Sequence, residues 1–85
     1  MNTVEQAMKR IENDKTWGNA SLRKENAHVE LEFLGEDEDA FLFRSWVIPN
    51  GKTLASCTAR ERKKYSDYDL CVAKSGESVT AIIED

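Results

Sequence analysis

The sequence is poor in proline, glycine and cysteine. Its 85 residues include one Pro, four Gly and two Cys, Cys57 and Cys71. So few Pro and Gly leave no low-complexity linker, and the chain has no internal repeat. Two cysteines are too few for a disulfide framework or a zinc site. We therefore expect two reduced, half-buried thiols. The alternative, a Cys57–Cys71 bridge, would need adjacent strands and an oxidising compartment.

Long apolar runs are also missing. No purely apolar run, such as residues 40–43, exceeds four residues, whereas a transmembrane helix needs about 20. The N-terminal MNTVEQAMKR has no apolar segment of the kind found in a signal peptide. With 33% charged and 40% hydrophobic residues, the composition is typical of a globular protein. We expect one cytoplasmic domain without a membrane partner.

The residues that usually carry catalysis are scarce. His28 is the only histidine, and period-two alternation places it on a polar strand face beside Glu30 and Glu32. No Walker loop, zincin or dinucleotide motif occurs. Glu61-Arg62-Lys63 has the E-x-K shape of metal-dependent nucleases, but such a triplet arises easily by chance. We expect no catalytic residue, no metal, no cofactor and no enzymatic activity.

The N-terminal segment predicts an amphipathic helix of about 11 residues. Thr3 and Gln6 have the spacing of a capping box. The apolar residues that follow recur at i, i+3, i+4 and i+7, which places them on one helix face: Val4, Ala7, Met8 and Ile11. Asn13-Asp14 and Gly18 are expected to end the helix.

After the helix the apolar period changes to two, which predicts strands over HVELEFL and AFLFRSWVI. SLRKEN, residues 21–26, is a possible edge strand. Asn50-Gly51 predicts a two-residue hairpin loop, with KTLASCTA returning so that Val47 opposes Leu54. Ser75-Gly76 predicts a second hairpin in which Val72 faces Val79.

Together these elements predict an α+β fold, with one N-terminal helix packed on an antiparallel sheet of four or five strands arranged as a meander of hairpins. Residues 59–66 are ambiguous. Thr58 and Glu61 form another possible capping box that favours a short helix, but the same residues could extend a strand. The strand over AFLFRSWVI is apolar on both faces. The helix is expected to cover one face, and the second is less fully accounted for.

Carboxylates are concentrated in one segment. Residues 25–39 contain seven acids and no Lys or Arg, whereas the other 70 residues carry nine acids and twelve bases. A simple explanation is a solvated hairpin loop, whose charges also discourage edge pairing. Unspaced acids after Gly35 do not fit a calcium loop. A like-charged surface also steers a basic partner, so we expect a protein-binding face formed by Glu30, Glu32, Glu36, Asp37, Glu38 and Asp39, with Trp17 as a possible aromatic anchor.

Two other binding functions remain open. Basic and aromatic residues alternate over 60–68, as in proteins that bind a phosphate backbone and stack bases: Arg60, Arg62, Lys63, Lys64, Tyr65 and Tyr68. The sequence pI near 5.0 makes nucleic acid the less favoured ligand. A small-molecule pocket between helix and sheet, near Trp17 and Trp46, is the third hypothesis.

The preferred hypothesis is a small acidic binding protein, an inhibitor or regulator that occupies a basic surface of a larger protein. In size and charge the chain is similar to immunity proteins and phage anti-defence proteins, and the analogy extends no further. Pairing of two copies through an edge strand is left open by the sequence.

Overall fold

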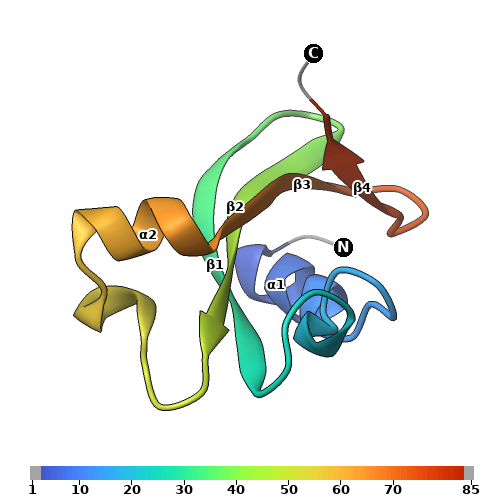
Figure 1. The fold of residues 1–85 in the computed structure, drawn as a ribbon. Coiled ribbons are helices and arrows are strands. Elements are labelled where there is room, and N and C mark those ends of the chain that lie inside the picture. The colour runs from blue at the N-terminus through green and yellow to red at the C-terminus, as the bar shows by residue number, and fades with distance from the viewer. Residues whose placement is uncertain (1–2, 84–85) are drawn as a thin grey trace.

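A computed structural model describes residues 3–83 of the chain. Four strands form one antiparallel sheet in the order β1-β2-β3-β4, which is the expected meander, and the helix α1 lies against one face (Figure 1). The fold is α+β, as the sequence predicts. The elements in chain order are α1 (Val4–Glu12), η1 (Ala20–Leu22), β1 (Ala27–Glu36), β2 (Ala40–Pro49), η2 (Leu54–Ser56), α2 (Ala59–Tyr65), β3 (Ser66–Ala73) and β4 (Val79–Ile82).

Helix α1 begins and packs as its sequence predicts. The Thr3 side chain accepts a hydrogen bond from the Gln6 N–H, and the Gln6 side chain accepts one from the Thr3 N–H. These two bonds satisfy N–H groups that have no partner within the helix. Ala7 and Ile11 are fully buried against the sheet. The apolar stripe of α1 therefore supplies one layer of the core.

The sheet face toward α1 forms the main hydrophobic core. Alternation along β2 points Phe41 and Phe43 toward the helix, and β3 adds Leu70 and Val72 beside them. All four side chains are at most 1% exposed. Burial of a large apolar side chain contributes about 1.5–3 kcal/mol. This layer is therefore the main source of the fold's stability.

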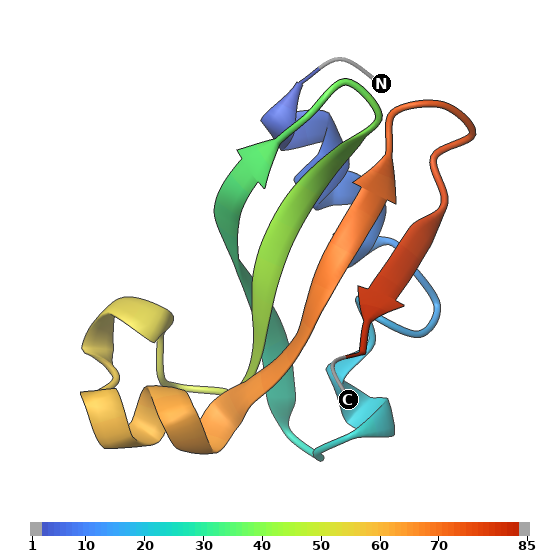
Figure 2. The same cartoon turned by 90° about the horizontal axis from the view of Figure 1, so that it is seen from above.

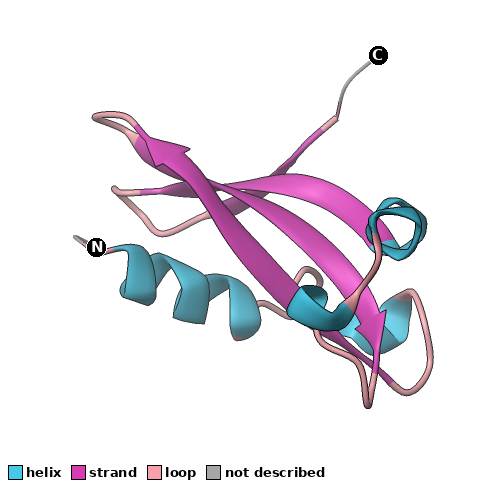
Figure 3. Cartoon of the chain, turned by 90° about the vertical axis from the view of Figure 1, so that its left-hand side faces the viewer, coloured by secondary structure: helices cyan, strands magenta, loops and turns pink. Residues whose placement is uncertain are grey.

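The opposite face is covered along only part of its length. Trp46 and Ile48 of β2 point away from α1 and are 6% and 0% exposed. The Trp46 Nε1 donates a 3.1 Å hydrogen bond to the Arg62 carbonyl of α2, which fixes α2 over this end of the sheet. Figure 3 shows α1 and α2 on opposite sides of the strands. Figure 2 shows α1 behind the sheet and α2 at one end of it.

The hairpin predicted at Asn50-Gly51 is wrong. The Lys52 N–H does bond to the Pro49 carbonyl, so a turn forms there. Gly51 has a φ of +94°, but Asn50 does not have a positive φ, because Asn26 and Glu77 are the only non-glycine residues in the described chain that do. The hairpin turns of types I′ and II′ both need positive φ at the first central residue, which would be Asn50 here, whereas type I and II turns splay the strands. The chain therefore leaves the sheet after β2, and Val47 pairs with Val29 of β1.

Residues 52–65 form helical turns instead of a returning strand. Thr53 caps η2, and the capping box of Thr58 and Glu61 begins α2, as the sequence pattern favoured. The second edge of β2 is then free for β3, and Phe43 pairs with Leu70. The short helix expected near residues 59–66 is confirmed.

The possible edge strand at residues 21–26 is also wrong. Ala20–Leu22 form the 3-10 helix η1, in which the Asn19 side chain accepts a hydrogen bond from the Ser21 N–H. Short polar side chains of this kind bond to their own backbone and favour turns over strands. Four strands therefore make up the sheet, with β1 and β4 at its edges.

The two hairpins that connect neighbouring strands follow the sequence pattern. Leu70 pairs with Ala81 and Val72 with Val79, which is the predicted register. Of the acidic residues after Gly35, Glu36 ends β1, and Asp37, Glu38 and Asp39 form the loop between β1 and β2, as expected for a charged hairpin loop. Among the helices of residues 3–83, none combines the length and apolar character that would be needed to cross a membrane.

Candidate functional site

The acidic loop between β1 and β2 is shaped by one of its own carboxylates. Asp37 Oδ1 accepts hydrogen bonds from the backbone N–H groups of Asp39 (2.7 Å) and Ala40 (2.9 Å). These two donors lower the pKa of Asp37, because they stabilise its ionised form. Asp37 therefore has a structural role in the turn, in addition to its predicted place in a binding face.

A second carboxylate ties the loop to the neighbouring strand. Glu36 Oε2 lies 2.8 Å from Lys74 Nζ, and the same ammonium lies 4.9 Å from the centre of the Phe41 ring. The Lys74 N–H also donates to the Asp39 carbonyl over 2.8 Å. The loop is thus held against the end of β3, so its charges have a defined position.

Three predicted acidic residues keep their carboxylates free of intramolecular partners. Glu32, Glu38 and Asp39 are exposed, and no donor within residues 3–83 bonds to their side-chain oxygens. Glu32 lies opposite Arg44 in the β1–β2 register, but Arg44 pairs with Asp69 at 3.4 Å. Within the predicted acidic face, these three residues are therefore the ones whose carboxylates make no hydrogen bond or ion pair with the described chain.

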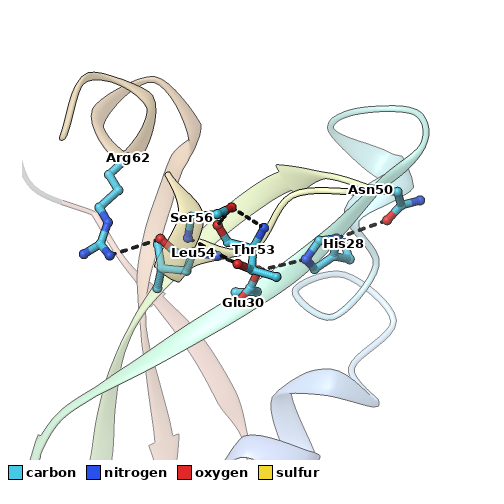
Figure 4. A network of polar contacts seen from close by, with 7 residues as sticks. All are labelled: His28, Glu30, Asn50, Thr53, Leu54, Ser56 and Arg62. Carbon is cyan, nitrogen blue, oxygen red and sulfur yellow. Dashed lines mark hydrogen bonds and ion pairs between the residues drawn. The ribbon is translucent and has the colours of Figure 1, made fainter. Parts of the chain in front are cut away.

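Glu30 has a different environment from the other acids of the predicted face. Its Oε2 accepts a 2.9 Å hydrogen bond from the Leu54 N–H, and it lies 2.9 Å from His28 Nε2. Its side chain is 28% exposed. Figure 4 shows Glu30 pointing from β1 to the start of η2. Glu30 therefore anchors the 52–65 segment to the sheet.

His28 is part of the same polar network. Its Nδ1 lies 3.1 Å from Asn50 Oδ1, at the turn after β2 (Figure 4). Arg62 completes the network from α2, since its guanidinium donates to the Leu54 carbonyl over 3.0 Å. No nucleophilic side chain bonds to His28 within the described residues. These contacts hold the turn and η2 in place, and they do not resemble a nucleophile–base pair.

The sequence did not predict the open apolar hollow beside the acidic loop. It measures about 410 Å³ and lies on the sheet face opposite α1. The residues that line it are Gly35, Glu36, Asp37, Ala40, Leu42, Cys71 and Ile82. The available signal was the second apolar face of β2, of which η2 and α2 cover only the Trp46 and Ile48 end. The hollow and the acidic loop are therefore parts of one surface.

Trp17 is placed as a lid on the core rather than as an exposed anchor. It is half-buried and packs against the core beneath α1. Its ring meets that of Tyr68 edge-on, with centroids 5.5 Å apart, and the Arg23 guanidinium lies 5.6 Å from its centre. Trp17 and Trp46 lie on opposite sides of the sheet, so they do not line one pocket.

The basic segment is divided by the fold. Arg62 bonds to η2, and Tyr68 lies with Trp17 on the α1 side of the sheet. The ammonium of Lys64 lies 5.7 Å from the Tyr65 ring centre, and that of Lys24 lies at the same distance. Arg60 and Lys63 are exposed on α2. Lys24 lies outside the basic segment predicted from the sequence, because it is about 40 residues away from Tyr65 along the chain.

No metal centre is apparent in the part of the chain that the structure describes, since no three His, Cys, Asp or Glu side chains there are grouped to hold an ion. Cys57 and Cys71 are both free and half-buried, as predicted.

Comparison with known proteins gives no match: no family model, no curated protein and no solved structure is significantly similar to this chain. A function for this chain therefore has to be inferred from the geometry of its candidate site.

Proposed function

We propose that this chain is a non-enzymatic binding protein that acts in the cytoplasm by occupying a basic surface of a larger protein, as an inhibitor or regulator does. The observation that carries the proposal is the position of the free carboxylates. Glu32 projects from β1, while Glu38 and Asp39 lie in a loop that Asp37 and Lys74 hold in place. A fixed group of like charges costs self-repulsion, and a complementary partner offsets that cost.

The acidic residues contribute unequally to this proposal. Glu32, Glu38 and Asp39 are the ones that we assign to the partner. Glu30, Glu36 and Asp37 have intramolecular bonds, so substitution of these three would mix loss of binding with loss of structure. Their part in binding stays a prediction, as does that of Trp17.

The test begins with capture of the partner from a native lysate, with and without nuclease treatment, followed by rate measurements on the purified pair. The variant Glu32→Gln, Glu38→Gln, Asp39→Asn removes the free carboxylates without touching a structural bond. We expect its association rate to fall about tenfold at 50 mM salt, because electrostatic steering acts mainly on association. Raising salt to about 500 mM should slow the wild type similarly.

The matched control is Arg60→Gln, Lys63→Gln, which removes exposed charges of the opposite sign from α2. This control should bind the partner within about twofold of wild type. If the acidic variant associates as fast as wild type at low salt, the acidic loop is only a solvated turn and the proposal is wrong.

The second candidate is a nucleic-acid-binding module on α2. It is favoured by the position of Lys24, whose ammonium lies next to the Tyr65 ring together with that of Lys64. Lys24 therefore adds a cation to the basic segment. Phosphate contacts give a steep salt dependence. On this alternative, the Arg60→Gln, Lys63→Gln variant would lose its ligand, the acidic variant would not, and nuclease would abolish capture.

A further inference from the structure

The sheet face opposite α1 is half covered and half open. Along β2, every second residue points to this face: Ala40, Leu42, Arg44, Trp46 and Ile48. The Trp46 and Ile48 end is buried under η2 and α2. At the other end, no helix within residues 3–83 covers this face, since α1 lies behind the strands (Figure 2). The apolar residues there remain accessible.

Several apolar side chains are partly exposed at the open end of the sheet. Leu42 and Cys71 are half-buried, Ile82 is 39% exposed, and Leu34 at the bulge of β1 is 36% exposed. Three of these residues, Leu42, Cys71 and Ile82, line the hollow of about 410 Å³. That size is within the range of clefts that take small-molecule ligands, about 300–1,000 Å³, so the hollow has room for a large side chain. A contiguous apolar area with a polar rim is a typical interaction site.

The charges around the hollow select its occupant. Glu36 and Asp37 line it, and Glu38 and Asp39 follow in the same loop. Lys74 pairs with Glu36 and Arg44 with Asp69, so these four charges offset one another. The carboxylates of Asp37, Glu38 and Asp39 have no ion-pair partner within residues 3–83 and leave the rim negative. Two copies of this chain meeting through this face would bring like charges together, which is destabilising. The rim therefore favours a basic occupant over a second copy.

We propose that the hollow receives one large apolar side chain of the partner, from a segment in which basic residues flank that side chain. This inference rests on the proposed function, because the hollow would be the centre of the partner-binding surface and the free carboxylates would be its edge. An apolar anchor in a pocket, surrounded by polar contacts, is the usual arrangement of an interface hot spot. The carboxylates would then set the association rate, and the anchor would set the dissociation rate.

Four capped peptides of seven residues test the chemistry without the partner itself. Their sequences are KKKFKKK, KKKSKKK, SSSFSSS and EEEFEEE. Each is titrated into the ¹⁵N-labelled protein, and the backbone amide shifts of Leu42, Cys71 and Ile82 are followed. We expect KKKFKKK to move these amides and to bind about tenfold more tightly than either KKKSKKK or SSSFSSS. EEEFEEE should bind least.

Two variants locate the effect. Ile82→Ser shortens a side chain that lines the hollow, and it should weaken KKKFKKK about tenfold while leaving KKKSKKK unchanged. The acidic variant Glu32→Gln, Glu38→Gln, Asp39→Asn should weaken both lysine peptides alike. As a second readout, in a Cys57→Ser background, KKKFKKK should slow alkylation of Cys71 by N-ethylmaleimide and KKKSKKK should not.

The outcomes separate this inference from the proposed function. Equal binding of KKKFKKK and KKKSKKK, with no protection of Cys71, would overturn the anchor and leave the acidic face standing. Equal binding of SSSFSSS and KKKFKKK would overturn the basic occupant and indicate a neutral apolar ligand. A concentration-dependent dimer in sedimentation that Ile82→Ser abolishes would assign the hollow to a second copy, and the inference would be wrong.

Discussion

Glu30 and Glu32 provide a matched pair for testing which acidic side chains of β1 stabilise the fold. They lie two residues apart on the same face of β1, so strand propensity and formal charge are equal for both. Only Glu30 accepts the 2.9 Å hydrogen bond from Leu54 and contacts His28. Hydrogen bonds to a charged group contribute about 1.5–3 kcal/mol. Because Glu30 is 28% exposed, we expect Glu30→Ala to lower the free energy of unfolding by about 1–2 kcal/mol.

The control, Glu32→Ala, should change that free energy by less than about 0.5 kcal/mol, since its carboxylate has no bond to lose. Urea unfolding with an unchanged m value measures both effects. For a domain of this size, about 1 kcal/mol corresponds to a Tm shift of roughly 4–8 °C. Hydrogen exchange adds a local readout, because the Leu54 amide should exchange faster in Glu30→Ala and not in Glu32→Ala. Equal costs for the two variants, or an unchanged Leu54 amide, would refute the anchoring role of Glu30.

Three further predictions test the fold. Gly18→Ala should lower the free energy of unfolding in urea by about 2 kcal/mol or more, because a Cβ there would lie 2.3 Å from two backbone oxygens at the end of α1. A Gly18→Ala variant as stable as the wild type would contradict that close approach. The hydrogen bond from Lys52, and then the backbone at the start of α2, lower the pKa of Glu61 from 4.5 to about 2, so its contribution to stability is present above pH 4.5 and is lost as pH falls toward 2. Unfolding measured across that range should show a smaller loss for Glu61→Gln, and an ordinary pKa for Glu61 in a carboxyl NMR titration would contradict the assignment. The double variant Cys57→Ser, Cys71→Ala should fold at a cost of about 1–3 kcal/mol, and the mass of the wild type should be the same before and after reduction; a gain of two hydrogens on reduction would reveal a disulfide.

Much of the fold could be predicted from the sequence because its signals are local. The capping boxes at Thr3 and Thr58 join residues three positions apart, and both are present. The Leu70–Ala81 register depends on a short loop between adjacent strands. In each case the interacting groups are close along the chain, so little loop-closure entropy opposes the contact.

The candidate site was less predictable. The acidic segment was recognised from composition, yet the sequence could not distinguish Glu32, which is free, from Glu30, which bonds to Leu54 24 residues away. Nor could it place Lys24 beside Tyr65. Such contacts depend on where distant segments pack, and side-chain periodicity in one strand carries no information about them.

The sequence by itself determined the helix α1, the four segments that form β1 to β4 and the two hairpins between neighbouring strands. Tertiary structure decided which segment pairs with the second edge of β2. The local pattern at Asn50-Gly51 favoured a tight hairpin, but β3 brings Leu70 and Val72 into the core, where both are fully buried. The burial gained by this non-local pairing outweighs a turn preference, which is worth little by comparison. That choice sends residues 52–65 across only one end of the sheet, and the apolar hollow remains open at the other end.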